Sequence, residues 1–306
     1  MTDATRVAAI DCGTNSIRLL ITDLSSSGQH DVLREMRIVR LGQNVDRTKH
    51  LDEAAIERTL TALREYRELI ASFEVAHVRF CATSAVRDAD NGAQFADRVE
   101  ALLGVRPQVL AGTEEAAASF LGATRALGPG RTVVVDIGGG STEIVVGDGA
   151  TIESAVSLDI GSVRLTERFF ASDPPTVDEI TACIDHLDAV LAAPTSGLAS
   201  IPRLVGVAGT VTTVAAHVMG LASYDSQAIH GARLLMADVR AACLSLVQMS
   251  VADRRALGFM HPGRADVIGA GALILDRLIE ALPIDSDAML VSESDILDGI
   301  AWSAIA

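Results

Sequence analysis

The segment at residues 136–143 reads DIGGGSTE, a glycine-rich turn flanked by two acids. Three consecutive glycines let the main chain approach a ligand closely and turn its N–H groups outward, as main-chain anion sites require. The turn residues Gly138, Gly139, Gly140 and Ser141 therefore predict a phosphate site. Asp136 and Glu143 can both point into this turn, where hard oxygen ligands favour Mg²⁺ or Mn²⁺. The alternative is a hairpin with two solvated acids.

A second segment at residues 11–16 reads DCGTNS and aligns with the first, so that Asp11 matches Asp136. In the same alignment Gly13 matches Gly138 and Ser16 matches Ser141. Asp11 could reach the metal through water, and a second phosphate could be bound by the main chain and side chains of Gly13, Thr14, Asn15 and Ser16. Arg18 stands where the other copy has Glu143, so the two loops are complementary. A surface arginine beside a strand is an equally good interpretation of Arg18.

Two further glycine steps could offer N–H groups at the start of a helix to an anion. Gly209-Thr210 lies between an expected strand and an expected helix, and Gly161-Ser162 precedes the segment SVRLTERF. Each dipeptide is a weak motif by itself. An ordinary turn explains Gly161-Ser162 about as well as a phosphate contact does.

A helix beginning TEEAAASF carries Glu114 and Glu115 just after Thr113, the expected N-cap. Acids are common there because the helix dipole stabilises them. The same dipole keeps a carboxylate ionised, as a general base must be. Spacing alone favours the structural interpretation over the catalytic one.

Two arginines stand at the edges of expected helices and could neutralise substrate charge. Arg87 lies between a strand and a helix, and Arg264 opens a helix rich in small residues. Each could instead pair with a neighbouring acid, Asp88 or Asp266. The histidines show no metal-ligand spacing.

These loops belong to a repeated pattern of elements. Each copy of the hairpin is followed by a third strand and then by alternating helices and strands, which gives the order βββαβαβα about twice. The order predicts an α/β protein with two lobes, each a mixed, largely parallel sheet with helices on both faces. Ligands should bind at the carboxyl ends of the strands, in a cleft between the lobes.

Composition narrows the partners of this 306-residue chain. Its net charge of −15 repels nucleic acids and anionic membranes, so a polyanion must meet a locally basic or metal-neutralised site. The single lysine, Lys49, and the absence of a G-K-[ST] step argue against a P-loop.

Four widely spaced cysteines predict reduced core thiols. No apolar run reaches the roughly 20 residues of a membrane span, and the amino terminus does not resemble a secretory signal, so we expect a cytoplasmic protein.

Taken together, the motifs resemble the exopolyphosphatase and guanosine pentaphosphate phosphohydrolase family of the actin-like superfamily. The resemblance runs through DCGTNSIRLLI, RLGQNVD, ATSAVRDADN, AGTEEAAASFLGA, VVVDIGGGSTEIVVG, LDIGSVRLTERF, VGVAGT and HPGRADVIGAGALIL, in that order. It implies two actin-like (ribonuclease H-like) lobes, lobe I at 1–122 and lobe II at 123–290, with a C-terminal helix at 291–306 that returns to lobe I. We also expect a homodimer.

The resemblance further implies roles for individual residues. Glu115 would be the catalytic base, Arg87 and Arg264 would contact phosphates, and Asp136 and Glu143 would bind the metal with help from Asp11. Two departures stand out. Gln43 occupies a position where relatives often have Glu, and residues 296–299 read ILDG where many relatives have Leu-Arg-Glu-Gly.

We therefore expect an exopolyphosphatase, a metal-dependent hydrolase that releases the terminal orthophosphate of inorganic polyphosphate and prefers short chains. One alternative is hydrolysis of guanosine pentaphosphate at the same site. Others are a regulator that binds polyphosphate or an alarmone without catalysis, and an actin-like sugar or acetate kinase.

Overall fold

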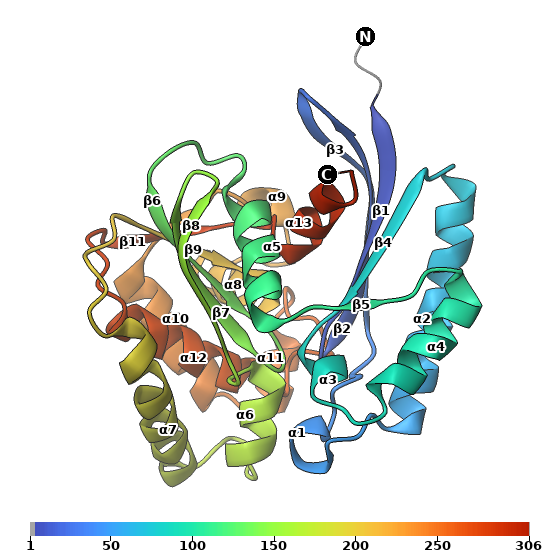
Figure 1. The fold of residues 1–306 in the computed structure, drawn as a ribbon. Helices are drawn as coiled ribbons and strands as arrows, with labels where there is room; N and C mark the ends of the chain where they lie inside the picture. The colour runs from blue at the N-terminus through green and yellow to red at the C-terminus, as the bar shows by residue number, and fades with distance from the viewer. Residues whose placement is uncertain (1–3, 306) are drawn as a thin grey trace. The chain divides into compact units, whose positions relative to one another are not determined.

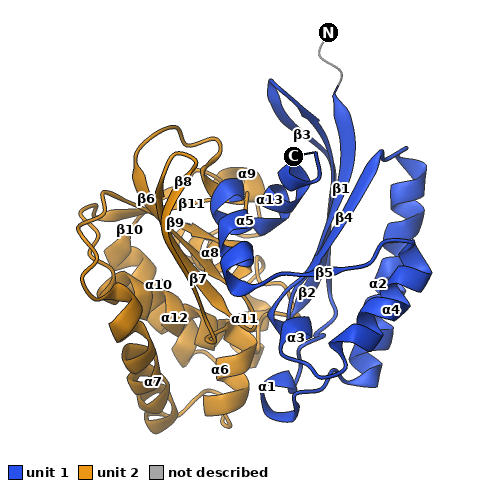
Figure 2. Cartoon of the chain, in the orientation of Figure 1, with its two compact units in different colours: residues 1–122, 296–306 blue, residues 123–295 orange. Residues whose placement is uncertain are grey.

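The computed structural model describes residues 4–305 and divides into two compact units (Figure 2). Unit 1 comprises Met1–Gly122 and Ile296–Ala306, and unit 2 comprises Ala123–Asp295. Residues 1–3 and 306, including the end of the expected C-terminal helix, lie outside the described residues. The chain therefore leaves unit 1 once and returns to it for its last helix.

Unit 1 is built on a five-stranded sheet in the order β3-β2-β1-β4-β5. The central strand β1 is antiparallel to β2 and parallel to β4, so the sheet is mixed rather than largely parallel. The hairpins account for the antiparallel half, because a short turn can join only antiparallel strands. The strands are β1 (Thr5–Cys12), β2 (Ser16–Ser25), β3 (Gly28–Ile38), β4 (His77–Ala82) and β5 (Gln108–Val109).

Helices cover both faces of this sheet, as Figure 1 shows. Alternate residues of a strand point to opposite faces. Ala8 and Ile10 of β1 therefore pack into the apolar cluster that includes α2 and α4, and Val7 and Ala9 pack into a second cluster with α13. The helices of unit 1 are α1 (Val45–Thr48), α2 (Glu53–Ser72), α3 (Ser84–Arg87), α4 (Gly92–Leu103), α5 (Gly112–Thr124) and α13 (Ile296–Ser303).

The returning helix α13 begins later than predicted, because Val291 ends a strand of unit 2. Leu297, at the position where the family resemblance led us to expect an arginine, is fully buried in the second apolar cluster of unit 1. An arginine at this position would bring a charge into that cluster. Gly299 of the same helix lies so close to α5 that a Cβ there would be 2.0 Å from the carbonyl oxygen of Ala118.

Unit 2 repeats the plan with one extra strand, in the order β10-β11-β9-β6-β7-β8. β6 is antiparallel to β7 and parallel to β9, as β1 is to β2 and β4. The unpredicted strand is β10, three residues antiparallel to β11 at the sheet edge. The strands are β6 (Arg131–Ile137), β7 (Thr142–Asp148), β8 (Thr151–Leu158), β9 (Arg203–Val207), β10 (Arg233–Leu235) and β11 (Ala288–Val291).

The helices of unit 2 enclose its core, with α12 buried along most of its length. They are α6 (Ser162–Phe169), α7 (Val177–Thr195), α8 (Ala208–Val218), α9 (Ser226–Ile229), α10 (Met236–Gln248), α11 (Val251–Ala256) and α12 (Ile268–Ala281). None of the helices between residues 4 and 305 is both long enough and apolar enough to cross a membrane. Both units thus follow the predicted βββαβαβα order, and the mixed α/β fold class is confirmed.

Candidate active site

The two glycine hairpins have the same main-chain geometry. In unit 1 the Gly13 N–H donates to the Ser16 carbonyl at 2.9 Å, and in unit 2 the Gly138 N–H donates to the Ser141 carbonyl at 3.0 Å. The strand registers also agree, with Asp11 opposite Arg18 and Asp136 opposite Glu143. The two hairpins therefore pair equivalent residues, as the alignment of the two sequence copies predicts.

In unit 2 the carbonyl side of the turn is covered by the start of α6. The Ser162 N–H donates to the Gly138 carbonyl at 3.0 Å, and the N–H groups of Val163 and Arg164 donate to that of Gly139 at 2.9 and 3.1 Å. A Cβ on Gly161 would lie 2.4 Å from the Gly139 carbonyl oxygen, so only glycine allows this approach. The Ser162 N–H is thus used inside the protein, and Gly161-Ser162 supports the turn.

The opposite side of the same turn presents main-chain donors. Across the described chain, the N–H groups of Gly139, Gly140 and Ser141 make no main-chain hydrogen bond. This is the arrangement that a main-chain anion site needs. The structure also adds a residue that the sequence interpretation missed, because the buried Arg164 donates from Nε to the Gly140 carbonyl at 2.7 Å. The available signal was an arginine two residues after Gly161-Ser162.

Two buried carboxylates flank this turn. Asp136 is 6% exposed and Glu143 is 2% exposed, and they face each other across the β6–β7 ladder. The Ser157 hydroxyl donates to Glu143 Oε1 at 2.7 Å, a contact that no sequence pattern indicates. Two like charges held together in a buried place favour a bound cation, and their oxygens suit Mg²⁺ or Mn²⁺.

Residues 4–305 contain no cluster of three or more histidine, cysteine, aspartate or glutamate side chains that could hold a metal ion. The predicted ligands are divided between the units, with Asp11 in unit 1 and the facing pair in unit 2. Mg²⁺ commonly keeps several waters and takes only one or two protein carboxylates. Asp136 and Glu143 fit that pattern.

The third glycine element lies in the β9–α8 turn of unit 2. Ala208 opens α8 with a φ of 67°, a left-handed value that costs energy for a residue with a Cβ. Nothing in the sequence marks an alanine for this conformation. The guanidinium of Arg264 packs on the next residue, since a Cβ on Gly209 would lie 2.4 Å from Cζ and Nη2 of Arg264.

Helix α12 brings a second pair of predicted residues together. A Cβ on Gly271 would lie 2.8 Å from Thr210 Cγ2 and 3.2 Å from Ser162 Cβ, so this glycine lets the starts of α6 and α8 approach the same helix. Thr210 and Ser162 are both 6% exposed. Unit 2 therefore gathers all its predicted phosphate-binding segments around one region.

The turn of unit 1 is supported by residues 39–42 in place of a helix. The Asn15 carbonyl accepts from the N–H groups of Val39 and Arg40 at 3.0 and 2.9 Å, and the Thr14 carbonyl accepts from Gly42 at 2.9 Å. A Cβ on Gly42 would lie 2.4 Å from Thr14 Cγ2. Here too the carbonyl side of the turn is occupied by the protein.

Asp11 and Arg18 form an ion pair, with Nη2 and Nε of Arg18 donating to Asp11 Oδ2 at 2.6 and 2.9 Å. The sequence interpretation gave them separate roles, one toward the metal and the other toward phosphate. The register explains the pairing, because the two residues lie directly opposite each other in the β1–β2 ladder. Neighbours across an antiparallel pair interact in this way.

The predicted base and its predicted arginine meet in unit 1. Nη1 of Arg87 donates to Glu115 Oε2 at 2.9 Å and to the Leu110 carbonyl at 2.9 Å, and Glu115 is 8% exposed. Glu114 has a different contact, because its Oε2 accepts from the Ala111 N–H at 2.7 Å. Glu114 thus caps α5, which begins at Gly112 instead of after Thr113 as predicted.

The four cysteines are buried and free, as predicted. Burial raises the pKa of Cys81 to about 11 and that of Cys183 to about 12. Thiols with such pKa values are poor nucleophiles and poor metal ligands at neutral pH. The chemistry of the site therefore rests on carboxylates, arginines and main-chain amides.

The two α/β units thus share one plan, and each carries a glycine hairpin that follows an aspartate and whose carbonyl side is covered by the protein. A profile of the Ppx/GppA phosphatase family matches residues 20–305. The chain belongs to this family.

Individual relatives extend the match to nearly the whole chain. The chain is 48% identical to Exopolyphosphatase 2 of Mycobacterium tuberculosis, with 98% of each protein covered. The crystal structure of an exopolyphosphatase-like protein, 42% identical, matches with a TM-score of 0.93 and 98% coverage of both chains. The Ppx/GppA family member from Aquifex aeolicus, 34% identical, matches with a TM-score of 0.84 over 99% of this chain and 98% of that one. The fold class expected from the family resemblance is confirmed.

Proposed function

We propose that this protein is a metal-dependent exopolyphosphatase, which hydrolyses the terminal phosphoanhydride of inorganic polyphosphate and releases orthophosphate. The observation that carries the proposal is family membership together with the contact of Arg87 with Glu115. The relative named Exopolyphosphatase 2, at 48% identity over 98% of both chains, points to the substrate. Enzymes of this family generally depend on divalent metal ions.

Unit 1 supplies the group that acts on water. Glu115 would accept a proton from the attacking water, or orient that water toward the terminal phosphorus. Arg87 contacts the carboxylate through Nη1, which also donates to the Leu110 carbonyl. Its Nε and Nη2 would donate to phosphate oxygens. Phosphoryl transfer depends mainly on positioning and charge stabilisation, and a positioned arginine can contribute about 10³–10⁵ in rate.

Unit 2 supplies the binding groups for phosphate charge. The N–H groups of Gly139, Gly140 and Ser141 would donate to one phosphate, with Arg264 and the start of α8 beside them. Asp136 and Glu143 would hold Mg²⁺ or Mn²⁺, which when bound would neutralise phosphate oxygen charge. The hairpin of unit 1, from Gly13 to Ser16, would contact a second phosphate.

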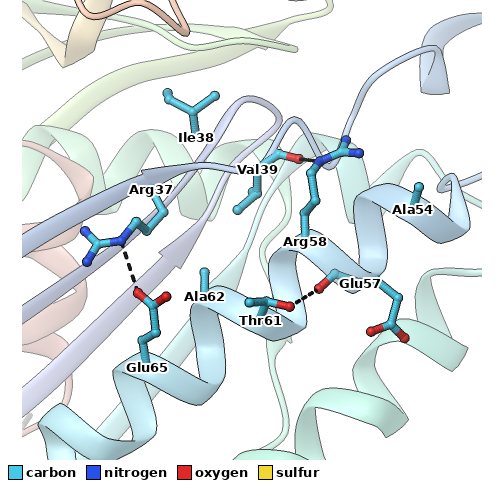
Figure 3. Close-up of a pocket in the computed structure, with 9 residues that line it drawn as sticks. All are labelled: Arg37, Ile38, Val39, Ala54, Glu57, Arg58, Thr61, Ala62 and Glu65. Atoms are coloured by element: carbon cyan, nitrogen blue, oxygen red, sulfur yellow. Dashed lines mark hydrogen bonds and ion pairs between the residues drawn. The ribbon is translucent and has the colours of Figure 1, made fainter.

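We further propose that short chains are the preferred substrates. A long polyphosphate would need a row of available cations, yet two of the arginines on β3 are already paired with acids. Arg34 contacts Asp298 at 2.6 Å, and Arg37 contacts Glu65 at 3.2 Å. A groove of about 660 Å³ lies beside β3 and α2. Its lining carries both signs of charge, and Figure 3 labels Arg37, Arg58, Glu57 and Glu65 among the residues that line it.

Chain-length preference is measured as kcat/KM per chain end, for chains from three to several hundred phosphates, at two salt concentrations. We expect kcat/KM to stay level or fall as the chain grows. The highest kcat/KM for the longest chains, with a steep salt dependence, would contradict the proposed preference for short chains. Such a result would indicate a row of basic side chains, because their binding to a polyanion releases counterions.

The activity itself is tested by orthophosphate release from short polyphosphate, long polyphosphate and guanosine pentaphosphate, side by side with Mg²⁺ and Mn²⁺. We expect release from polyphosphate with a higher kcat/KM than from the nucleotide. A higher value for guanosine pentaphosphate would assign the site to the nucleotide. Binding of either polyanion without release would make the protein a regulator.

A further inference from the structure

Arg254 of α11 is 1% exposed, and its guanidinium contacts main-chain carbonyl groups. Nε donates to the Leu246 carbonyl at 2.7 Å, Nη2 to that of Val247 at 3.0 Å, and Nη1 to that of Ala265 at 3.2 Å. Leu246 and Val247 belong to the last turn of α10. One buried side chain thus joins the end of α10 to the segment before α12.

Burial of the charged Arg254 guanidinium costs free energy. Burial lowers the pKa of Arg254, while the charges of Asp173 and Asp266 act in the opposite direction. Among residues 4–305, the hydrogen bonds of its guanidinium all go to carbonyl oxygens. Buried charged groups of this kind are often less stabilising than apolar residues of similar volume, so stability alone is a poor reason for an arginine here.

The surroundings leave space for the guanidinium. Gly269 lies in the first turn of α12, and a Cβ there would be 2.6 Å from Nη2 of Arg254. The neighbouring Arg255 is exposed on the same short helix. The chain therefore offers both a glycine whose substitution would crowd Arg254 and a matched arginine for comparison.

The segment that Arg254 holds carries Arg264. Ala265, whose carbonyl accepts from Arg254, directly follows Arg264. The Arg264 N–H donates to the His261 carbonyl at 2.9 Å, and the Arg264 carbonyl accepts from Val267 and Ile268 at 3.0 and 2.9 Å. The guanidinium of Arg264 then reaches Gly209 at the start of α8.

We propose that Arg254 is a positioning residue, which fixes the main chain around Ala265 so that Arg264 presents its guanidinium at the Gly209-Thr210 turn. This proposal rests on the proposed function, in which Arg264 contacts substrate phosphate. Arg254 itself is buried and would touch no substrate. Its three carbonyl contacts need the fork of a guanidinium, and an ammonium could satisfy only part of them.

The experiment measures kcat and KM for orthophosphate release from short polyphosphate, well below the Tm of each variant. Arg264→Ala is the reference for loss of the phosphate contact, and Arg255→Met is the matched control. We expect Arg254→Met to raise KM by about tenfold, since small misplacements of a binding group have large effects. Arg254→Lys should recover part of that loss, and Arg255→Met should leave KM at the parent value.

A second variant covers the case in which Arg254→Met does not fold. Gly269→Ala keeps the arginine but crowds its guanidinium, and it should raise KM in the same direction by a smaller factor. A lowered Tm with parent-like KM in both Arg254→Met and Gly269→Ala would show a purely structural role and overturn the proposal. If the parent protein itself released no orthophosphate, the proposed function would fail instead, which separates the two results.

Discussion

The β1–β2 hairpin of unit 1 and the β6–β7 hairpin of unit 2 have the same turn but opposite electrostatics. Each has an aspartate before the turn, at Asp11 and Asp136, and each closes the turn with a glycine N–H on a serine carbonyl. Opposite the aspartate stands Arg18 in one hairpin and Glu143 in the other. The first pair neutralises itself, and the second concentrates negative charge that a cation can neutralise.

The comparison extends to what covers each turn. Residues 39–42 occupy the carbonyl side in unit 1, and the start of α6 occupies it in unit 2. Two unrelated segments thus make the same kind of contact, because each donates N–H groups to the carbonyl oxygens of its turn. One hairpin plan thus places an ion pair beside the turn in unit 1 and two carboxylates in unit 2, and the two copies differ in this respect by a single facing residue.

The largest expected effect concerns the base that we propose for unit 1, Glu115, which lies outside the hairpin. Glu115→Gln keeps the shape of the side chain but removes its basicity, so kcat should fall by about 10²–10⁴ with little change in KM. The measurement is steady-state orthophosphate release. Glu114→Gln is the control, because Glu114 caps α5, and loss of a cap costs only about 1 kcal/mol of stability. Equal losses of kcat in both variants would remove Glu115 from its catalytic role.

The next prediction tests whether the metal requirement depends on the carboxylates of the second hairpin more than on Arg18 of the first. Asp136→Asn and Glu143→Gln should each raise the metal concentration needed for half-maximal activity, because a hard cation loses an anionic ligand. Arg18→Met should change this metal requirement far less. Chelation should abolish activity in the parent protein. Activity that persists after exhaustive chelation would contradict a metal role for the second hairpin.

Substitutions in the two hairpins should change the free energy of unfolding in opposite directions. Arg18→Met leaves Asp11, with its side chain 6% exposed, without its ion-pair partner, and should destabilise the protein by about 1–3 kcal/mol. Glu143→Gln relieves repulsion with Asp136, so in chelator the protein should gain about 1 kcal/mol and melt a few degrees higher. Thermal unfolding in chelator checks both. The same sign for both variants would refute the electrostatic contrast.

The smallest expected effect is the difference in stability loss between two variants, one in each segment that covers a turn. Gly161→Ala would place a Cβ 2.4 Å from a main-chain oxygen, whereas Gly42→Ala would place one 2.4 Å from the Thr14 methyl group, which can move more easily. Overpacking costs about 1–3 kcal/mol, and we expect Gly161→Ala to lie at the upper end and Gly42→Ala at the lower. Denaturant unfolding measures the difference. A larger loss for Gly42→Ala would mean that the turn of unit 1 is the more rigid one.

Much of the site could be predicted from the sequence because its signals are local. The duplicated apolar strands and glycine turns predicted the βββαβαβα order, and the alignment of Asp11 with Asp136 predicted two equivalent hairpins, whose registers agree in the structure. Glycine turns and the two-residue repeat of a strand depend only on residues that are close in the sequence. They can therefore be recognised from the sequence alone. The expected helices and strands were accordingly found, with small shifts at their ends.

What only the tertiary structure decided depends on contacts between distant segments. The cover of each turn, the contact of Arg87 with Glu115, and the carbonyl contacts of Arg254 join residues that no local pattern connects. The left-handed Ala208 is held by its surroundings against its own preference. By itself, the sequence determined which side chains could do the chemistry. Packing decided which of them meet, because the hydrogen-bonding needs of buried groups are satisfied only when the whole chain has folded.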